Sequence, residues 1–175
     1  MKVLLVIDML NDFLLPSGPL YCGDKAQAIV PLVKRTLQAF RKEGAPIFFV
    51  ADAHRKDDVE FDRFPPHCIK GTSGASLLAG LYAEGEPIIE KTRYSAFYNT
   101  DLEEQLEALS QTSGEPLEVH VVGVCTHICV YFTVEELRNR DIKTIVYRDG
   151  VASFDDVAHD FCLTQMESVL GAEIL

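Results

Sequence analysis

The chain lacks several features that define large classes of protein. It has no glycine- and serine-rich or charge-rich linker and no internal repeat. Its first apolar run, residues 1–7, stops at Asp8, which is too short for the apolar region of a signal peptide or for a membrane span. These absences predict one cytoplasmic globular domain over residues 1–175, a length that can bury a proper core.

Basic residues are scarce relative to acidic ones. The chain has 16 Lys and Arg against 27 Asp and Glu, which gives a formal net charge of -11 at pH 7. Nucleic acids and anionic membranes attract clustered Lys and Arg, so this balance argues against both as partners. We expect a small-molecule ligand instead.

Cysteines are few and odd in number. There are five, none in a CxxC pair, at Cys22, Cys68, Cys125, Cys129 and Cys162. This pattern argues against a disulfide framework. Cys129 follows an apolar, β-branched run and opens a helical pattern, and a helix start lowers the pKa of a thiol. Cys129 is therefore a candidate nucleophile, with burial as a small apolar residue as the alternative, whereas we expect Cys125 to serve packing.

Strand-like and helical patterns alternate along the chain. The strand-like runs are residues 3–7, 47–50, 87–89, 119–124 and 143–147. This alternation predicts an α/β fold with a parallel sheet covered by helices. The apolar C-terminal residues 172–175 suggest a final edge strand.

Besides the helical pattern that begins near Cys129, in which Val130, Thr133, Val134 and Leu137 recur at helical spacing, three helices are predicted from periodicity and capping signals. The first ends at Gly44, and Thr100 opens a capping box at the start of the second. The third begins after Ser153. The apolar residues expected to face inward are Ile29, Leu32, Val33, Leu37 and Phe40 in the first, Leu106 and Leu109 in the second, and Val157, Phe161 and Val169 in the third.

Four polar residues stand at or just beyond the ends of predicted strands. They are Asp8, Asp52, Lys91 and Cys129. Ligands of open parallel sheets bind beyond the carboxyl ends of the strands, so these side chains are expected to converge. Residues 14–24 and 52–74 fit no helix or strand pattern, and long irregular loops are usually functional.

Asp8 and Lys91 each allow two interpretations. A semi-buried Asp8 would have a raised pKa and act as a general base, whereas an exposed one would cap the following turn. Lys91 would stabilise a nearby thiolate, or it would simply be solvated. Arg93 and Tyr94 are as consistent with ion-pair and packing roles as with a place in the site.

Asp52 and His54 alternate along an extended segment, so their side chains share one side, and His67 follows in the same loop. One carboxylate and two imidazoles suit zinc, manganese or iron, and Glu60 is available as a further ligand. The alternative is a chance spacing on a polar loop.

Taken together, these motifs resemble the isochorismatase-like superfamily of cysteine hydrolases and, within it, the nicotinamidases and pyrazinamidases. The resemblance spans nearly the whole chain. Its landmarks are residues 7–13, residues 52–54 with 64–74, residues 90–97, and residues 123–130.

The resemblance implies a three-layer α/β/α fold with a mostly parallel sheet and assigns a role to each motif. Cys129 would be the nucleophile, Asp8 its base and Lys91 the third catalytic residue. A cis peptide between Val124 and Cys125 would direct the backbone N–H groups of Cys125 and Cys129 into an oxyanion hole.

The same resemblance implies ligands and a substrate. One divalent ion, zinc first and manganese or iron otherwise, would be held by Asp52, His54 and His67, with Glu60 where some members have another acidic ligand. Phe13 and Phe64 would sandwich a pyridine ring. Family members typically assemble as homo-oligomers.

The implied activity is hydrolysis of nicotinamide, and of pyrazinamide, to the acid and ammonia through a thioester. Two alternatives stay open: another amidase of the superfamily acting on a carbamoyl or ureido compound without metal, and a non-catalytic metal-binding or redox protein. Isochorismate hydrolysis would leave Cys129 without a role. His127 departs from the aspartate usual in the family, and we interpret it as a neutral substitute in the same hydrogen bond.

Overall fold

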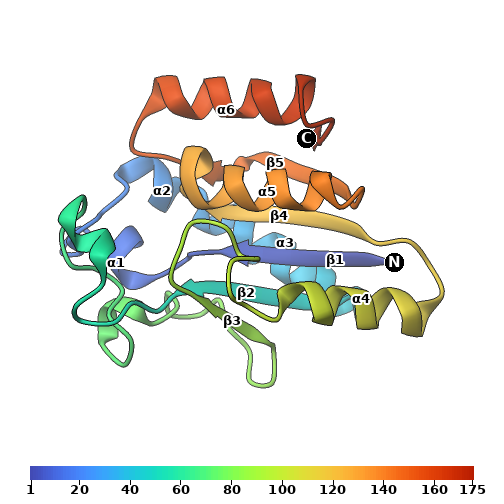
Figure 1. The fold of residues 1–175 in the computed structure, drawn as a ribbon, viewed down its shortest axis with the longest axis horizontal. Coiled ribbons are helices and arrows are strands. Elements are labelled where there is room, and N and C mark those ends of the chain that lie inside the picture. Colours follow the sequence, from blue (N-terminus) through green and yellow to red (C-terminus); the bar gives the residue numbers. More distant parts are fainter.

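A parallel β-sheet forms the centre of the computed structural model, which describes residues 1–175 (Figure 1). Its six strands are arranged in the order β3-β2-β1-β4-β5-β6. The strands are β1 (Lys2–Ile7), β2 (Ile47–Asp52), β3 (Ile88–Lys91), β4 (Glu118–Val124), β5 (Lys143–Ala152) and β6 (Glu173–Ile174). The α/β prediction is confirmed, and the C-terminal residues form the expected edge strand against β5.

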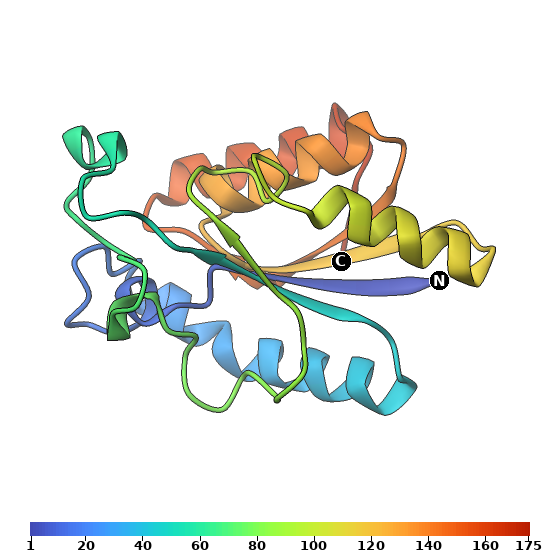
Figure 2. The same ribbon diagram turned by 60° about the horizontal axis from the view of Figure 1, so that its bottom comes forward.

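Helices cover both faces of the sheet (Figure 2). One face carries α1 (Asn11–Leu14), α2 (Asp24–Ala28) and α3 (Val30–Glu43), and the other carries α4 (Leu102–Ser113), α5 (Tyr131–Asn139) and α6 (Asp156–Ser168). Alternate residues of β1 enter two separate cores, since Leu5 packs with α5 while Leu4 packs with α3. A strand that is buried on both faces carries apolar residues at every position. This explains why the apolar run of β1 is continuous and does not alternate with polar residues.

Helix α3 follows the sequence prediction closely. Pro31 lies in its first turn, and Gly44 ends it in the left-handed conformation with φ of 67°. Val33, Leu37 and Phe40 are buried against the sheet, whereas Leu32 is only partly covered. None of the helices is both long and apolar enough to span a membrane.

The predicted inward face of α6 is wrong. Val157, Phe161 and Val169 are 82%, 61% and 67% exposed. The buried side chains are Cys162, Leu163 and Met166. Residue 162 is turned about 100° from residue 161 on a helix, and the sequence carries apolar residues at both angles, so periodicity alone could not select the face that meets the sheet.

The predicted capping box at Thr100 is also only partly present. Helix α4 begins at Leu102, whose N–H donates to the Thr100 hydroxyl over 3.3 Å. Glu103 does not return a bond to Thr100, because its carboxylate pairs with Arg140 at 2.8 Å. A tertiary ion pair has replaced the local hydrogen bond of the capping box.

The carboxyl ends of the strands meet at one edge of the sheet. Asp8 follows β1, Asp52 ends β2, Lys91 ends β3, and a π-helical turn (Thr126–Val130) carrying Cys129 follows β4. Strand β1 lies between β2 and β4, where the strand order reverses direction, which is where open parallel sheets bind ligands.

Candidate active site

Asp8 is fully buried at the end of β1 and adopts a positive φ of 50°. Its Oδ1 accepts the N–H of Asp52 at 3.0 Å, and its Oδ2 lies 2.8 Å from the Lys91 ammonium. The carboxylate therefore joins strands β1, β2 and β3 rather than capping its own turn. Burial, with the nearby charge of Asp52, raises the pKa of Asp8 to about 6 although Lys91 opposes the shift.

Lys91 is also buried, with 1% of its surface exposed, so the solvated interpretation is wrong. Its ammonium contacts the carboxylates of Asp8 and Asp52 and lies 3.4 Å from the Cys129 sulfur. Burial alone would lower the pKa of Lys91, but the charges of Asp52 and Asp8 outweigh it and raise that pKa well above its usual value. The residue stays an ammonium at neutral pH.

Cys129 lies within reach of both acids. Its sulfur and carboxylate oxygens of Asp8 and Asp52 all lie within 4.8 Å of one another. Burial raises the pKa of the Cys129 thiol well above its ordinary value, and the Lys91 ammonium opposes that shift without cancelling it. The expected lowering by a helix start is wrong for the resting protein, because removal from water outweighs the favourable charges.

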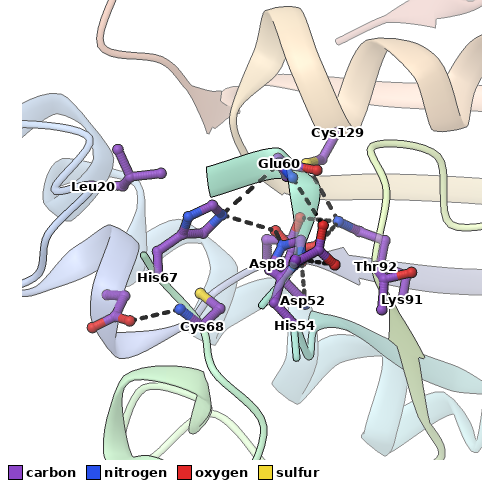
Figure 3. A network of polar contacts seen from close by, with 12 residues as sticks. Asp8, Leu20, Asp52, His54, Glu60, His67, Cys68, Lys91, Thr92 and Cys129 are labelled. Carbon is purple, nitrogen blue, oxygen red and sulfur yellow. Dashed lines mark hydrogen bonds and ion pairs between the residues drawn. The ribbon is translucent and has the colours of Figure 1, made fainter. Parts of the chain in front are cut away.

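A second buried cluster adjoins the first (Figure 3). Asp52 Oδ2 lies 3.6 Å from His54 Nε2 and 4.0 Å from His67 Nε2, and Glu60 Oε1 lies 3.9 Å from His67 Nε2. All four residues are buried. Asp52 thus belongs to both clusters, with one oxygen toward Lys91 and the other toward the imidazoles.

The donor set of this second cluster fits a divalent metal ion. His54 Nε2 and Glu60 Oε2 are buried without any hydrogen-bond partner. Such orphaned groups are costly, and here they belong to ligand types that zinc prefers. The Nδ1–H of His67 donates to the Pro65 carbonyl at 2.9 Å, which leaves Nε2 as a lone pair turned toward Asp52.

Asp58 holds the other side of His54, and the sequence interpretation missed it. Its Oδ2 lies 3.2 Å from His54 Nδ1, and Arg93 donates to Asp58 at 3.0 Å. Burial works against the charge of Asp58, yet the N–H of Glu60 and the contacts with His54 and Arg93 lower its pKa to about 2. The only sequence feature that points to Asp58 is its position two residues before Glu60, which is typical of an aspartate whose side chain caps a turn. Arg93 is an ion-pair residue, one of the two roles considered for it.

A cavity of about 480 Å³ opens beside both clusters. Cys129, Asp52, Glu60 and His67 form part of its wall. Most of the rest is apolar or aromatic and includes both predicted ring-binding residues: Phe13, Leu20, Tyr21, Cys22, Phe64, Tyr94, Cys125, Ile128 and Phe154. Residues 18–22 of this wall belong to the irregular segment 14–24 that the sequence analysis marked as functional. No motif indicated Phe154, which is distant along the chain.

Two smaller features match expectation. The peptide bond between Val124 and Cys125 is cis. His127 shares a hydrogen bond with the Ser153 hydroxyl and packs edge-on against Phe154. Burial lowers the pKa of His127, so it is neutral at pH 7, which agrees with its interpretation as a neutral hydrogen-bonding residue.

Comparison with known proteins gives matches over the whole chain. The isochorismatase domain model matches residues 2–175. The PncA protein of Bacillus subtilis, described as an uncharacterized isochorismatase family protein, is 37% identical over 184 residues, covering 99% of this chain and 98% of that one.

Solved structures also match this chain over nearly its whole length. The pyrazinamidase/nicotinamidase of Streptococcus mutans superposes with a TM-score of 0.91 at 34% identity and full coverage of both chains. The pyrazinamidase of Pyrococcus horikoshii, solved in complex with zinc, has a TM-score of 0.88 at 28% identity and covers 99% of this chain and 98% of that one.

Proposed function

The chain belongs to the isochorismatase family of hydrolases, and from this premise we propose that it is a metal-dependent amidase that hydrolyses nicotinamide and pyrazinamide through a cysteine thioester. One observation carries the proposal. The Asp8, Lys91 and Cys129 cluster and the metal-ligand cluster share Asp52 and open on the same aromatic cavity. A ring held at one cluster would present its amide to the other. The relatives solved as a pyrazinamidase/nicotinamidase and as a pyrazinamidase support the choice of substrate.

Asp52, His54 and His67 would hold the ion, with Glu60 as a fourth ligand. When bound, it would ligate the pyridine nitrogen and so orient the ring for attack. Zinc is our first choice because the donors are nitrogen and carboxylate oxygen and because the Pyrococcus horikoshii relative binds zinc. Phe13 and Phe64 would pack on the ring faces.

The protein's own residues perform the proton transfers. Asp8, whose pKa is raised to about 6, takes the proton of the Cys129 thiol. Lys91, which stays charged, stabilises the thiolate as it forms, so the sulfur is deprotonated only during the reaction.

The sulfur then bonds to the carboxamide carbon. The backbone N–H groups of Cys125 and Cys129 stabilise the oxyanion, a contribution of about 3 kcal/mol per donor. The C–N bond breaks, and ammonia leaves with the proton returned by Asp8. Water activated by the same carboxylate hydrolyses the thioester and releases the acid.

The test measures ammonia release from nicotinamide, pyrazinamide and a ureido compound, with and without chelator. We expect turnover of both ring amides, loss on chelation, and recovery with zinc. Cys129→Ala should lose at least about 10⁴-fold in kcat, while Cys162→Ala, a buried cysteine of α6, should not. A thioester on Cys129, trapped by acid quenching and seen by mass spectrometry, would complete the evidence.

Each alternative has its own outcome in this experiment. Turnover of the ureido compound alone, unaffected by chelator, would indicate a metal-free amidase of the same superfamily. Bound metal without turnover of any of the three compounds and without a trapped thioester would indicate a binding protein. Near-normal activity of Cys129→Ala would refute the nucleophile.

A further inference from the structure

Two thiols that the proposed mechanism does not use meet in the wall of the cavity. The sulfurs of Cys22 and Cys125 lie 3.0 Å apart although the residues are 103 positions apart in the chain. Both residues are buried and both line the cavity. The chain therefore places a pair of thiols in the wall of the cavity that Cys129 also lines. All five cysteines are free, so the fold has no disulfide.

The segments that carry the two thiols are held in place by the rest of the fold. The Cys22 N–H donates to the Phe13 carbonyl at 2.8 Å, which fixes the loop between α1 and α2. Cys125 directly follows β4, and its carbonyl accepts the N–H groups of Ile128 and Val130 at 3.0 and 3.2 Å. A disulfide needs its sulfurs about 2.05 Å apart, so closure requires a shift of about 1 Å.

We propose that Cys22 and Cys125 form a reversible disulfide that senses peroxide and closes down the cavity. One thiol gives up its proton and its sulfur attacks hydrogen peroxide; the O–O bond breaks and the leaving hydroxide takes up that proton, which gives a sulfenic acid and water. The other thiol attacks that sulfur, forms the S–S bond and releases a second water. Two thiols are oxidised and one peroxide is reduced, and an external dithiol reverses the reaction.

The surroundings of the two sulfurs bear on the reaction. Contact with Cys22, together with burial, raises the pKa of the Cys125 thiol well above its usual value, which disfavours the Cys125 thiolate in the resting protein. The Cys22 sulfur also lies 3.4 Å from the Leu20 carbonyl, and Leu20 is another wall residue of the same cavity.

The effect on catalysis rests on the proposed function. Closure draws the loop that carries Leu20 and Cys22 toward Cys125, whose backbone N–H is assigned to the oxyanion hole. A displacement of about 1 Å in a catalytic site costs up to about 100-fold in rate, so we expect the oxidised protein to lose at least about tenfold in kcat/KM.

The test treats the reduced, zinc-loaded protein with hydrogen peroxide, blocks the remaining thiols with iodoacetamide and maps the peptides by mass spectrometry. We expect a cross-linked peptide pair containing Cys22 and Cys125, and restoration of both thiols by dithiothreitol. Cys22→Ala should give no cross-link, while Cys162→Ala should cross-link like the unmodified protein. A Cys125–Cys129 link, or oxidation of Cys129 without any cross-link, would overturn the proposal.

Activity is measured on the same samples, each compared with its own reduced form. The unmodified protein and Cys162→Ala should lose activity on oxidation and regain it with dithiothreitol, whereas Cys22→Ala should keep a larger fraction. A complete cross-link with unchanged ammonia release would overturn the closure of the cavity. If the reduced protein hydrolyses none of the amides, the proposed function fails while the mapped disulfide still stands.

Discussion

Lys91 is the residue on which the site depends most. One buried ammonium serves two carboxylates and a thiol. Burying charges is costly unless each is paired, and two acids sharing one cation have no spare partner. The same contacts that keep Asp8 and Asp52 ionised therefore stabilise the edge of the sheet where three strands end.

Replacing this lysine is expected to destabilise the protein. Lys91→Met should lower the free energy of unfolding in chelator by about 3 kcal/mol or more, because it leaves two buried carboxylates unpaired. Urea denaturation at pH 7 in chelator measures this free energy of unfolding. Lys70→Met is the matched control: Lys70 pairs with Glu90, but its side chain is 65% exposed, so it should cost less than about 1 kcal/mol. Equal stability of the two variants would contradict this view of the site.

Asp58 acts through His54 rather than on a ligand, so its role is to position the imidazole. Asp58→Asn should weaken zinc binding about 10- to 100-fold, as loss of a carboxylate behind a metal-binding histidine usually does. Competition with a chromophoric chelator measures the affinity. Asp57→Asn is the control, since Asp57 is 74% exposed and pairs only with Arg55. Affinities within a factor of two for both variants would exclude the positioning role.

Residue identity was easier to predict from the sequence than protonation state. Asp8, Lys91 and Cys129 were found as polar residues at strand ends, and the structure brings them together. The pKa of Cys129 was predicted in the wrong direction because it depends on how much water the fold removes, which no local pattern records. Asp58 was missed for a related reason: its partner Arg93 is 35 positions away.

Among the elements, β4 and the turn that follows it set the position of the nucleophile. Gly123 lies at φ of 126°, and a Cβ there would be 1.9 Å from the carbonyl oxygen of Ile7. Only glycine allows β4 to approach β1 this closely before the chain turns toward Cys125.

Gly123→Ala should therefore be severe. We expect a loss of more than about 3 kcal/mol in unfolding free energy, or failure to fold, from the combined clash and backbone strain. Gly114→Ala provides the comparison, because Gly114 also has a positive φ of 66° but no heavy atom within 4 Å of the added Cβ. It should cost about 1 kcal/mol. Urea unfolding measures the loss of unfolding free energy in both variants. Similar losses would contradict the view that the close approach of β4 to β1 causes the effect of Gly123→Ala.

The strands and α3 were predictable because each combines a clear period with clear ends. The face of α6 was not, since Phe161 and Cys162 are both apolar and only packing decides between them. Phe154, just before that helix, and Val157 and Phe161, in its first half, are exposed. The expected homo-oligomer stays a prediction, which light scattering of the purified protein would test.

At the scale of the whole molecule, the parallel sheet brings the site together. Residues from β1, β2, β3 and the turn after β4 meet at one edge although they are spread over 122 positions from Asp8 to Cys129, with both ends of that span counted. The strand order that produces this meeting is not visible in any single motif. The resemblance to a family implied only a mostly parallel sheet between two layers of helices, which the fold confirms, and the structure adds the strand order.

A ligand that bridges several segments should stabilise the whole fold. Zinc at about 100 times its Kd should add about 2.7 kcal/mol to the unfolding free energy and raise Tm. Differential scanning calorimetry with and without chelator measures this. His67→Ala should remove most of the zinc-dependent rise, whereas exposed Arg55→Ala should keep it. A Tm that ignores zinc would mean that the four side chains do not form a metal site.

The shared carboxylate has one further consequence, for electroneutrality. Asp8, Asp52 and Glu60 can carry three negative charges around the single positive charge of Lys91, so the ionised cluster has a surplus of two. A divalent cation cancels that surplus. Without the cation, protons bound to the cluster must neutralise part of the negative charge. Loading the metal should therefore expel protons, and the heat of binding should vary with the ionisation enthalpy of the buffer chosen for the titration.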